Sequence, residues 1–207
     1  MDIESIERTY FGPEFRGHPG PVYADEMKSL SLPDRVSALK VRVDDYLISQ
    51  TDHLATRDLW TPFPLAIMTC VGVEWLGSYR YGDPGNNSNR HFQRVLEEVD
   101  PNLRDRRPAP DGKTKPLSDF IYFAFRNSLV HGFCGKWVFI THEDREAKDW
   151  VYGKREKVLV VNIYWLYREF KRAYANYFDS IAEAVNPAYE PLLTFNRTFE
   201  KHFSYWL

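Results

Sequence analysis

The residues of this chain that are best suited to chemistry lie in one short stretch, the sequence FAFRNSLVHG at 123–132. Arg126, Asn127 and His131 stand at the end of an otherwise apolar helical pattern, where long polar side chains need a task or a partner. Histidine titrates near neutral pH and can act as a general acid or base. Arginine offers a fixed fork of donors to phosphate oxygens. Cleavage of RNA uses both properties, because a ribose 2′-hydroxyl loses a proton while negative charge gathers on the phosphate.

The spacing of these residues predicts a site that two copies of the chain share. Asn127 and His131 are four positions apart and fall on one face of a helix. Arg126 and His131 are five positions apart, which separates them by about 140° around the helix axis. A site that uses both side chains closes more easily where two copies of the helix meet. We therefore expect a homodimer, with Asn127 holding the histidine ring or the phosphate and with no metal or other cofactor.

The stretch FRNSLVHG at 125–132 resembles the Arg-x4–6-His motif of HEPN-domain proteins (higher eukaryotes and prokaryotes nucleotide-binding). The run CVGVEWL at 70–76, with Glu74 in an apolar setting, is similar to the upstream helix of such domains, which often bears an acidic residue. The resemblance implies an all-α bundle that dimerises around the motif helices and cleaves RNA without a metal. It also implies a toxin–antitoxin or antiviral defence system, with an antitoxin or defence protein as partner. Toxin members often have a tyrosine two positions after the histidine, where this chain has Phe133. The motif roles fall to Arg126, Asn127 and His131.

The same residues leave other functions open. The motif helix could form the interface of a non-catalytic dimeric module, in which Arg126 holds a nucleotide, RNA or a carboxylate of a protein partner. The chain could instead be a small scaffold protein whose segment 136–161 docks onto a partner. Spacing alone does not decide, because Arg197 and His202 repeat the Arg-x4-His pattern in the last predicted helix. Their polar surroundings predict a solvated face, so the context favours the pair that includes His131.

Two further sets of residues are candidates for a supporting role. Glu74 could orient Arg126 through a buried ion pair, or it could be a partly exposed carboxylate near a helix end. A predicted loop at 100–115 is rich in proline and basic residues and directly precedes the motif helix. Its aspartates also fit an ordinary solvated loop. The arginines of this loop that could contact RNA phosphates are Arg104, Arg106 and Arg107.

The elements that must position these residues are mostly helices. A helix with an early proline is predicted from Ser31 to Leu47. Apolar periodicity predicts further helices over 64–81, 88–99, 117–132, 162–181 and 192–207. Beta-branched and aromatic residues at 136–161 predict a small β-hairpin or three-stranded insert before the long penultimate helix. The expected fold is mainly α, a HEPN-like helical bundle over 31–207, with an N-terminal arm rich in glycine and proline at 1–30.

The composition predicts one folded domain and excludes several classes of protein. Of 207 residues, 43% are hydrophobic and 16% aromatic, too high a share for a disordered chain. The net charge of -2 argues against wholesale nucleic-acid wrapping but permits a local basic patch. Two cysteines without a Cys-x-x-Cys pair predict neither a disulfide framework nor a zinc site. With no secretory leader and no apolar run long enough for a bilayer, we expect a cytoplasmic protein with no membrane partner.

Overall fold

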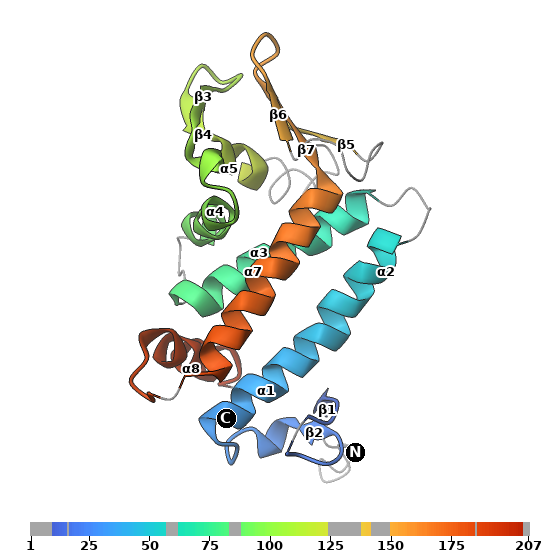
Figure 1. Cartoon of the computed structure of the whole chain (residues 1–207), viewed down its shortest axis with the longest axis vertical. Helices are drawn as coiled ribbons and strands as arrows, with labels where there is room; N and C mark the ends of the chain where they lie inside the picture. The colour runs from blue at the N-terminus through green and yellow to red at the C-terminus, as the bar shows by residue number, and fades with distance from the viewer. Residues whose placement is uncertain are drawn as a thin grey trace, which may run out of the picture.

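The computed structural model describes residues 10–15, 17–56, 62–82, 88–123, 138–141, 150–184 and 186–204. Long helices run side by side along the molecule, and a small sheet lies at one end of them (Figure 1). The prediction of a mainly helical fold with a small β insert before the long penultimate helix is confirmed. Membership of the HEPN family stays a prediction. Within the described ranges, none of the helices is both long enough and apolar enough to span a bilayer.

The first long helical segment begins where the sequence predicts. The Ser31 side chain accepts a hydrogen bond from the Asp34 backbone N–H at 3.4 Å and so caps the first helix, α1 (Leu32–Val43). This long segment then continues beyond the predicted end, through a π-helical stretch, η3 (Asp44–Ser49), into α2 (Gln50–Thr56). The apolar side chains of α1 face the rest of the bundle.

Two long helices form the centre of the bundle, α3 (Pro62–Tyr81) and α7 (Ile163–Ala182). Gly72 permits their close approach, because a Cβ atom at this position would overlap the ring of Phe170. Asn162 caps the start of α7. The Asn162 Oδ1 accepts hydrogen bonds from the backbone N–H groups two and three residues further on, at 3.0 and 3.3 Å.

Two shorter helices complete the described bundle, α4 (Ser88–Val99) and α8 (Glu190–His202). The bounds of α4 agree with the prediction. Pro191 stands in the first turn of α8, where a missing N–H costs no helical hydrogen bond. The helix therefore starts two residues earlier than the periodicity predicted.

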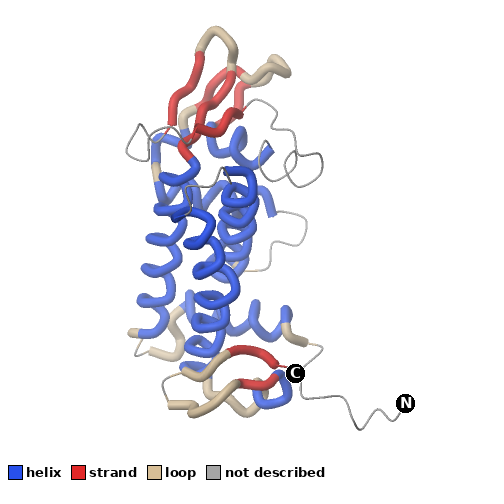
Figure 2. The backbone as a smooth tube through the Cα atoms, turned by 90° about the vertical axis from the view of Figure 1, so that its right-hand side faces the viewer, coloured by secondary structure: helices blue, strands red, loops and turns tan. Residues whose placement is uncertain are grey.

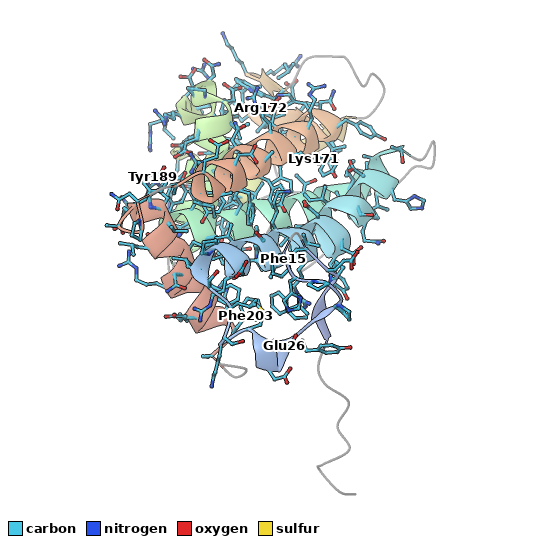
Figure 3. The ribbon with its side chains drawn as sticks, turned by 60° about the horizontal axis from the view of Figure 1, so that its bottom comes forward. Phe15, Glu26, Lys171, Arg172, Tyr189 and Phe203 are labelled. Carbon is cyan, nitrogen blue, oxygen red and sulfur yellow. The ribbon has the colours of Figure 1, made fainter. Side chains whose placement is uncertain are left out.

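The N-terminal segment forms two short antiparallel strands, β1 (Tyr10–Gly12) and β2 (Val22–Tyr23). Phe11 is fully buried, and its ring centroid lies 5.1 Å from that of Phe203 and 6.4 Å from that of Phe199. Figure 3 shows Phe15 and Phe203 at the same end of the bundle, close to α1. The N-terminal arm thus packs on the protein through Phe11 and Phe15, both of which are buried.

The predicted β insert is a three-stranded sheet. Its strands, in the order β5-β7-β6, are β5 (Val138–Thr141), β7 (Val158–Asn162) and β6 (Trp150–Gly153). The strands β6 and β7 form an antiparallel hairpin, whereas β5 pairs parallel to β7. A parallel pair joins strands that no tight turn connects, so local sequence patterns do not predict it. Because β7 runs directly into α7, the sheet is fixed on the end of the bundle (Figure 2).

The segment 100–115 is not the loop that the prolines predicted. It contains a short 3-10 helix followed by an antiparallel hairpin, and the elements are η4 (Pro101–Arg104), β3 (Arg106–Pro108) and β4 (Thr114–Pro116). The strand prolines stand at the last position of each strand, where a missing N–H interrupts no ladder. Gly112, at a φ of 81°, adopts the left-handed conformation of the turn between the strands.

Candidate functional site

The helix that leads to the motif, α5 (Leu117–Ile121), starts at the predicted residue. The side chains of Leu117, Phe120 and Ile121 are fully buried, so the apolar face of α5 is fixed on the core. A π-helical turn continues α5 to Phe123. The rest of the predicted helix lies outside the described residues, and with it Arg126, Asn127 and His131.

Polar contacts to α4 set the orientation of α5. The Ser118 hydroxyl donates a hydrogen bond to Glu97 at 2.6 Å, and the Gln93 amide donates one to Asp119 at 2.5 Å. Burial raises the pKa of the Asp119 carboxyl, while the positive charge of Lys115 lowers that pKa in part. Directional bonds of this kind fix the rotation of a short helix more closely than apolar contacts alone.

The motif segment, residues 124–137, begins and ends beside well-packed residues. Before its start, the Lys115 ammonium nitrogen lies 4.6 Å from the ring centroid of Phe123. After its end, Val138 opens β5 and pairs with Leu159 of β7, and both side chains are buried. The described residues on either side of the segment are therefore packed, Phe123 against the β3–β4 hairpin and Val138 in the sheet.

Glu74 lies in the middle of α3, as predicted, and is partly buried. Its neighbour Val73 is fully packed in the core, so α3 holds the carboxylate close to the interior of the bundle. This position suits an orienting role. The ion pair with Arg126 stays a prediction, since the arginine lies outside the described residues.

The arginines predicted to contact RNA lie at the end of the molecule that carries the sheet (Figure 1). Two of them are in exposed ion pairs. The Arg104 Nε lies 3.6 Å from Glu97 Oε2, and the Arg107 Nη2 lies 2.8 Å from Asp105 Oδ2. Arg106 is exposed and donates a hydrogen bond to a backbone carbonyl across the hairpin at 2.6 Å. The structure thus gathers the three arginines around one hairpin, where exposed pairs are weak enough to exchange their partner for a phosphate.

A second set of cations beside this hairpin was missed by the sequence reasoning. The turn between β6 and β7 carries Lys154, Arg155 and Lys157, all exposed. The Tyr152 hydroxyl donates a hydrogen bond to the Pro108 carbonyl and so joins the two hairpins. The signal in the sequence is the charged run at 154–157 between two strand patterns.

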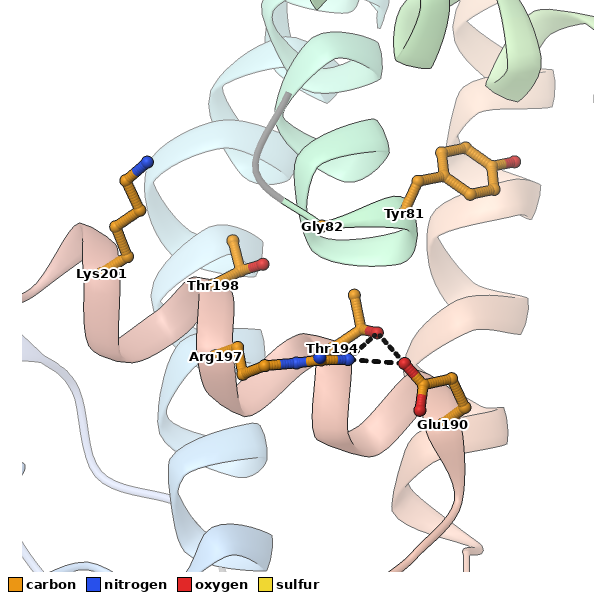
Figure 4. A pocket seen from close by; sticks show the side chains of 7 residues that line it. All are labelled: Tyr81, Gly82, Glu190, Thr194, Arg197, Thr198 and Lys201. Atoms are coloured by element: carbon orange, nitrogen blue, oxygen red, sulfur yellow. Dashed lines mark hydrogen bonds and ion pairs between the residues drawn. The ribbon is translucent and has the colours of Figure 1, made fainter. Parts of the chain in front are cut away.

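The second Arg-x4-His pair lies in α8, and its two side chains diverge. Arg197 is 67% exposed and pairs with Glu190 at 2.5 Å. It lines an open cavity of about 360 Å³ between α8 and the end of α3 (Figure 4). His202 does not line this cavity, and its Nδ1 lies 3.3 Å from the hydroxyl of the buried Tyr79. The prediction of a solvated face is confirmed, because Arg197 and His202 are both exposed. The His202 ring also lies edge-on to that of Tyr79, 5.3 Å away.

Comparison of the chain with models of protein families, with curated proteins and with solved structures finds no match. Across the described ranges, no three side chains of histidine, cysteine, aspartate or glutamate gather closely enough to hold a metal ion. The basis for a function is therefore the sequence motif together with the geometry around the two ends of the motif segment.

Proposed function

We propose that this protein is an endoribonuclease of HEPN type that works without a metal. His131 takes the proton of the ribose 2′-hydroxyl or gives a proton to the leaving 5′-oxygen, and Arg126 neutralises the charge that develops on the phosphate. Asn127 orients the histidine ring or the phosphate. The bond from the 2′-oxygen to phosphorus forms as the bond from phosphorus to the 5′-oxygen breaks. The products are a 2′,3′-cyclic phosphate and a 5′-hydroxyl end.

The observation that carries the proposal is the anchoring of residues on both sides of the motif segment. Before the segment, α5 begins at the buried Leu117. After the segment, Val138 begins β5, and its side chain is buried in the sheet. General acid–base groups act only when they are held precisely in position. Packed residues on either side of the segment favour such positioning. The cations of the neighbouring hairpin attract a polyanionic substrate to the same end of the protein.

The direct test is cleavage of single-stranded RNA with EDTA present. The wild-type protein is expected to cut and to leave 2′,3′-cyclic phosphate ends, which mass spectrometry identifies. His131→Ala and Arg126→Ala should each lower the rate by about 10²- to 10⁴-fold, the usual contribution of a positioned acid or base. Circular dichroism of the variants checks that the helices are intact. Equal rates in the wild type and both variants would contradict the assignment, and RNA binding without any cleavage would favour the non-catalytic module.

A mixed dimer tests whether two subunits share the site. If each site takes Arg126 from one subunit and His131 from the other, a dimer of one Arg126→Ala and one His131→Ala subunit keeps one complete site. We expect mixing of the two inactive variants to restore cleavage after subunit exchange. A strictly monomeric protein in sedimentation experiments, or no recovery from a verified mixed dimer, would contradict the shared site.

The cellular setting that we propose is defence or a toxin–antitoxin pair, in which a partner protein restrains the ribonuclease. Expression of the wild-type chain alone should then arrest bacterial growth and degrade RNA. Expression of His131→Ala at the same level should do neither. Growth arrest by both proteins would show that toxicity does not come from the motif.

A further inference from the structure

Two turns carry exposed cations at the sheet end of the protein. Residues 109–113 close the β3–β4 hairpin and residues 154–157 close the β6–β7 hairpin, and both turns point to the same end of the molecule (Figures 1 and 2). The hydrogen bond from Tyr152 to Pro108 joins the bases of the two turns, and the ring of Tyr152 packs edge-on against Phe120, 6.0 Å away. We name the exposed cations of this region the basic tip, and they are Arg106, Lys113, Lys154, Arg155 and Lys157.

The basic tip concentrates positive charge on a protein whose net charge is -2. The aspartates of its hairpin are already engaged, because Asp105 pairs with Arg107 at 2.8 Å and Asp111 pairs with Lys115 at 3.1 Å. Within the described residues, the basic tip itself takes part in no ion pair, and Glu156 is the one carboxylate of the two turns outside such a pair. A local excess of unpaired cations raises the local concentration of polyanions.

The backbone at Lys157 points to a use for its charge. Its φ is 55°, and within the described part of the chain it is the one non-glycine residue with a positive φ. Side-chain-bearing L-residues adopt this left-handed conformation at a cost, and glycine or asparagine is the usual choice. A lysine here weakens the turn and adds a cation to its end. Lys157→Gly therefore removes a charge without removing stability.

We propose that the basic tip binds the phosphate backbone of single-stranded RNA and delivers it to the motif segment. Lys115, next to the tip, lies against Phe123 before the segment, and Val138 after the segment pairs with Leu159, beside the turn at 154–157. An RNA strand held on the basic tip therefore lies at the same end of the molecule as α5 and β5, the described elements on either side of the motif segment (Figure 1). The choice of RNA as the polyanion rests on the proposed ribonuclease function.

The chemistry of the two turns favours phosphate over an acidic protein. Protein interfaces centre on aromatic or aliphatic anchors that become fully desolvated. The turns at 109–113 and 154–157 contain no aromatic residue, and apart from Glu156 their exposed long side chains are cations. Flexible cations of this kind track a charged backbone without reading its sequence.

The experiment measures fluorescence anisotropy of a labelled 2′-O-methyl RNA oligonucleotide, which lacks the nucleophile and cannot be cut. We expect the wild type to bind it with an affinity that falls steeply with salt. The triple variant Lys113→Gln, Lys154→Gln, Lys157→Gly should bind at least about tenfold more weakly at low salt. Its plot of log affinity against log salt should be shallower by about 2, because each lost phosphate contact on a single strand removes about 0.7 from the slope.

A matched control removes the same charge elsewhere. The triple variant Lys28→Gln, Arg90→Gln, Arg197→Gln loses three exposed cations outside the tip and should bind like the wild type.

The single variant Lys157→Gly should bind severalfold more weakly while its thermal midpoint stays equal or rises, and Glu156→Lys should bind severalfold more tightly. Equal binding by the tip and control variants, or an affinity that does not change with salt, would overturn the inference. Polyglutamate that displaces the RNA at lower concentration than unlabelled RNA would assign the tip to an acidic protein and would overturn it too.

The two proposals fail in distinguishable ways. If the wild type cuts RNA but the tip variants bind and cut as the control variant does, the ribonuclease stands and the basic tip is not its docking surface. If the tip variants lose binding while the wild type never cuts unmodified RNA, the tip is an RNA-binding surface and the ribonuclease assignment fails.

Discussion

The two ends of the bundle treat their charged side chains differently. At the α8 end, two arginines are matched on the protein: Arg35 lies 3.1 Å from Glu200, and Arg197 lies 2.5 Å from Glu190. At the sheet end, the described residues provide the basic tip with no ion-pair partner. Paired charges hold neighbouring helices in place, whereas unpaired charges remain available to a ligand. The difference indicates that a charge pattern points to binding only where the fold leaves it unmatched.

The two ends also differ in how they are packed. The α8 end is closed by interlocking rings, with Phe199 fully buried and its ring centroid 4.7 Å from that of Phe203 and 5.8 Å from that of Phe195. The sheet end is closed by short strands and by single hydrogen bonds, such as the one from the Trp150 indole to Asp100 at 2.8 Å. Aromatic packing therefore characterises the α8 end, whereas short strands and directional bonds shape the sheet end.

The largest expected effect compares the two Arg-x4-His pairs directly. His131→Ala should lower RNA cleavage by about 10²- to 10⁴-fold, because a general acid or base is lost. His202→Ala changes the same residue type at the same spacing and should leave the cleavage rate within about threefold, since its ring contacts Tyr79 and no reacting group. Initial rates on one RNA substrate provide the measurement. A similar loss in both variants would remove the distinction between the two ends.

The next effect concerns stability. Phe199→Ala at the α8 end should lower the free energy of unfolding by about 3 to 5 kcal/mol, because a fully buried ring leaves a cavity. The control is Leu193→Ala in the same helix, where a 38% exposed side chain buries much less surface and should cost less than about 1 kcal/mol. Urea unfolding followed by circular dichroism measures both. Equal losses would mean that the ring cluster does not stabilise this end.

Helices were the part of the fold that local sequence could predict. The starts of α1, α4 and α7 follow from capping residues and apolar periodicity, which act within a few residues along the chain. The parallel pairing of β5 with β7 and the β3–β4 hairpin could not be predicted, since long-range partners decide both. Proline in the hairpin suggested a loop because its favourable place at strand ends is visible only in the folded sheet.

The sequence predicts which residues of the candidate site could do chemistry, but it predicts only some of the charged residues around them. Glu74 lies on the predicted helix, and Arg104, Arg106 and Arg107 lie on the segment before the motif helix, as the chain order required. The cations of the β6–β7 turn were not predicted to belong to this region, because Lys154 is far from the arginines in sequence. The two hairpins are joined by the hydrogen bond between Tyr152 and Pro108, which local sequence does not reveal. Residue types can suggest a reaction, but the topology decides which charges meet.

A smaller effect should appear at alkaline pH and should come from the bundle rather than the sheet. Burial raises the pKa of the hydroxyls of Tyr79, Tyr174 and Tyr177, so these groups stay protonated in the folded protein. The unfolded chain releases their protons near pH 10, so this contribution to stability is complete below about pH 10 and is lost as the pH rises further. Each such tyrosine should lower the free energy of unfolding by about 1.4 kcal/mol per pH unit above that value.

The variant Tyr79→Phe tests this assignment. It keeps the buried ring and removes the titrating hydroxyl, so the fall in stability above pH 10 should become shallower than in the wild type. Urea unfolding at pH 9, 10 and 11 supplies the slope. A slope unchanged by the substitution would mean that Tyr79 is not one of the groups that couple stability to pH.

The smallest effect isolates the hydrogen bond that joins the two hairpins of the basic tip. Tyr152→Phe removes the donor to the Pro108 carbonyl and keeps the ring against Phe120, so the free energy of unfolding should fall by only about 0.5 to 1.5 kcal/mol. Amide exchange in β3 and β6 should nevertheless become faster, because the two turns separate more often. The control at the other end is Tyr189→Phe, whose side chain is exposed and whose hydroxyl forms no hydrogen bond within the described residues; it should change neither quantity. Faster exchange without a matching loss of RNA affinity would show that the two turns bind independently, and the basic tip would then be two separate sites.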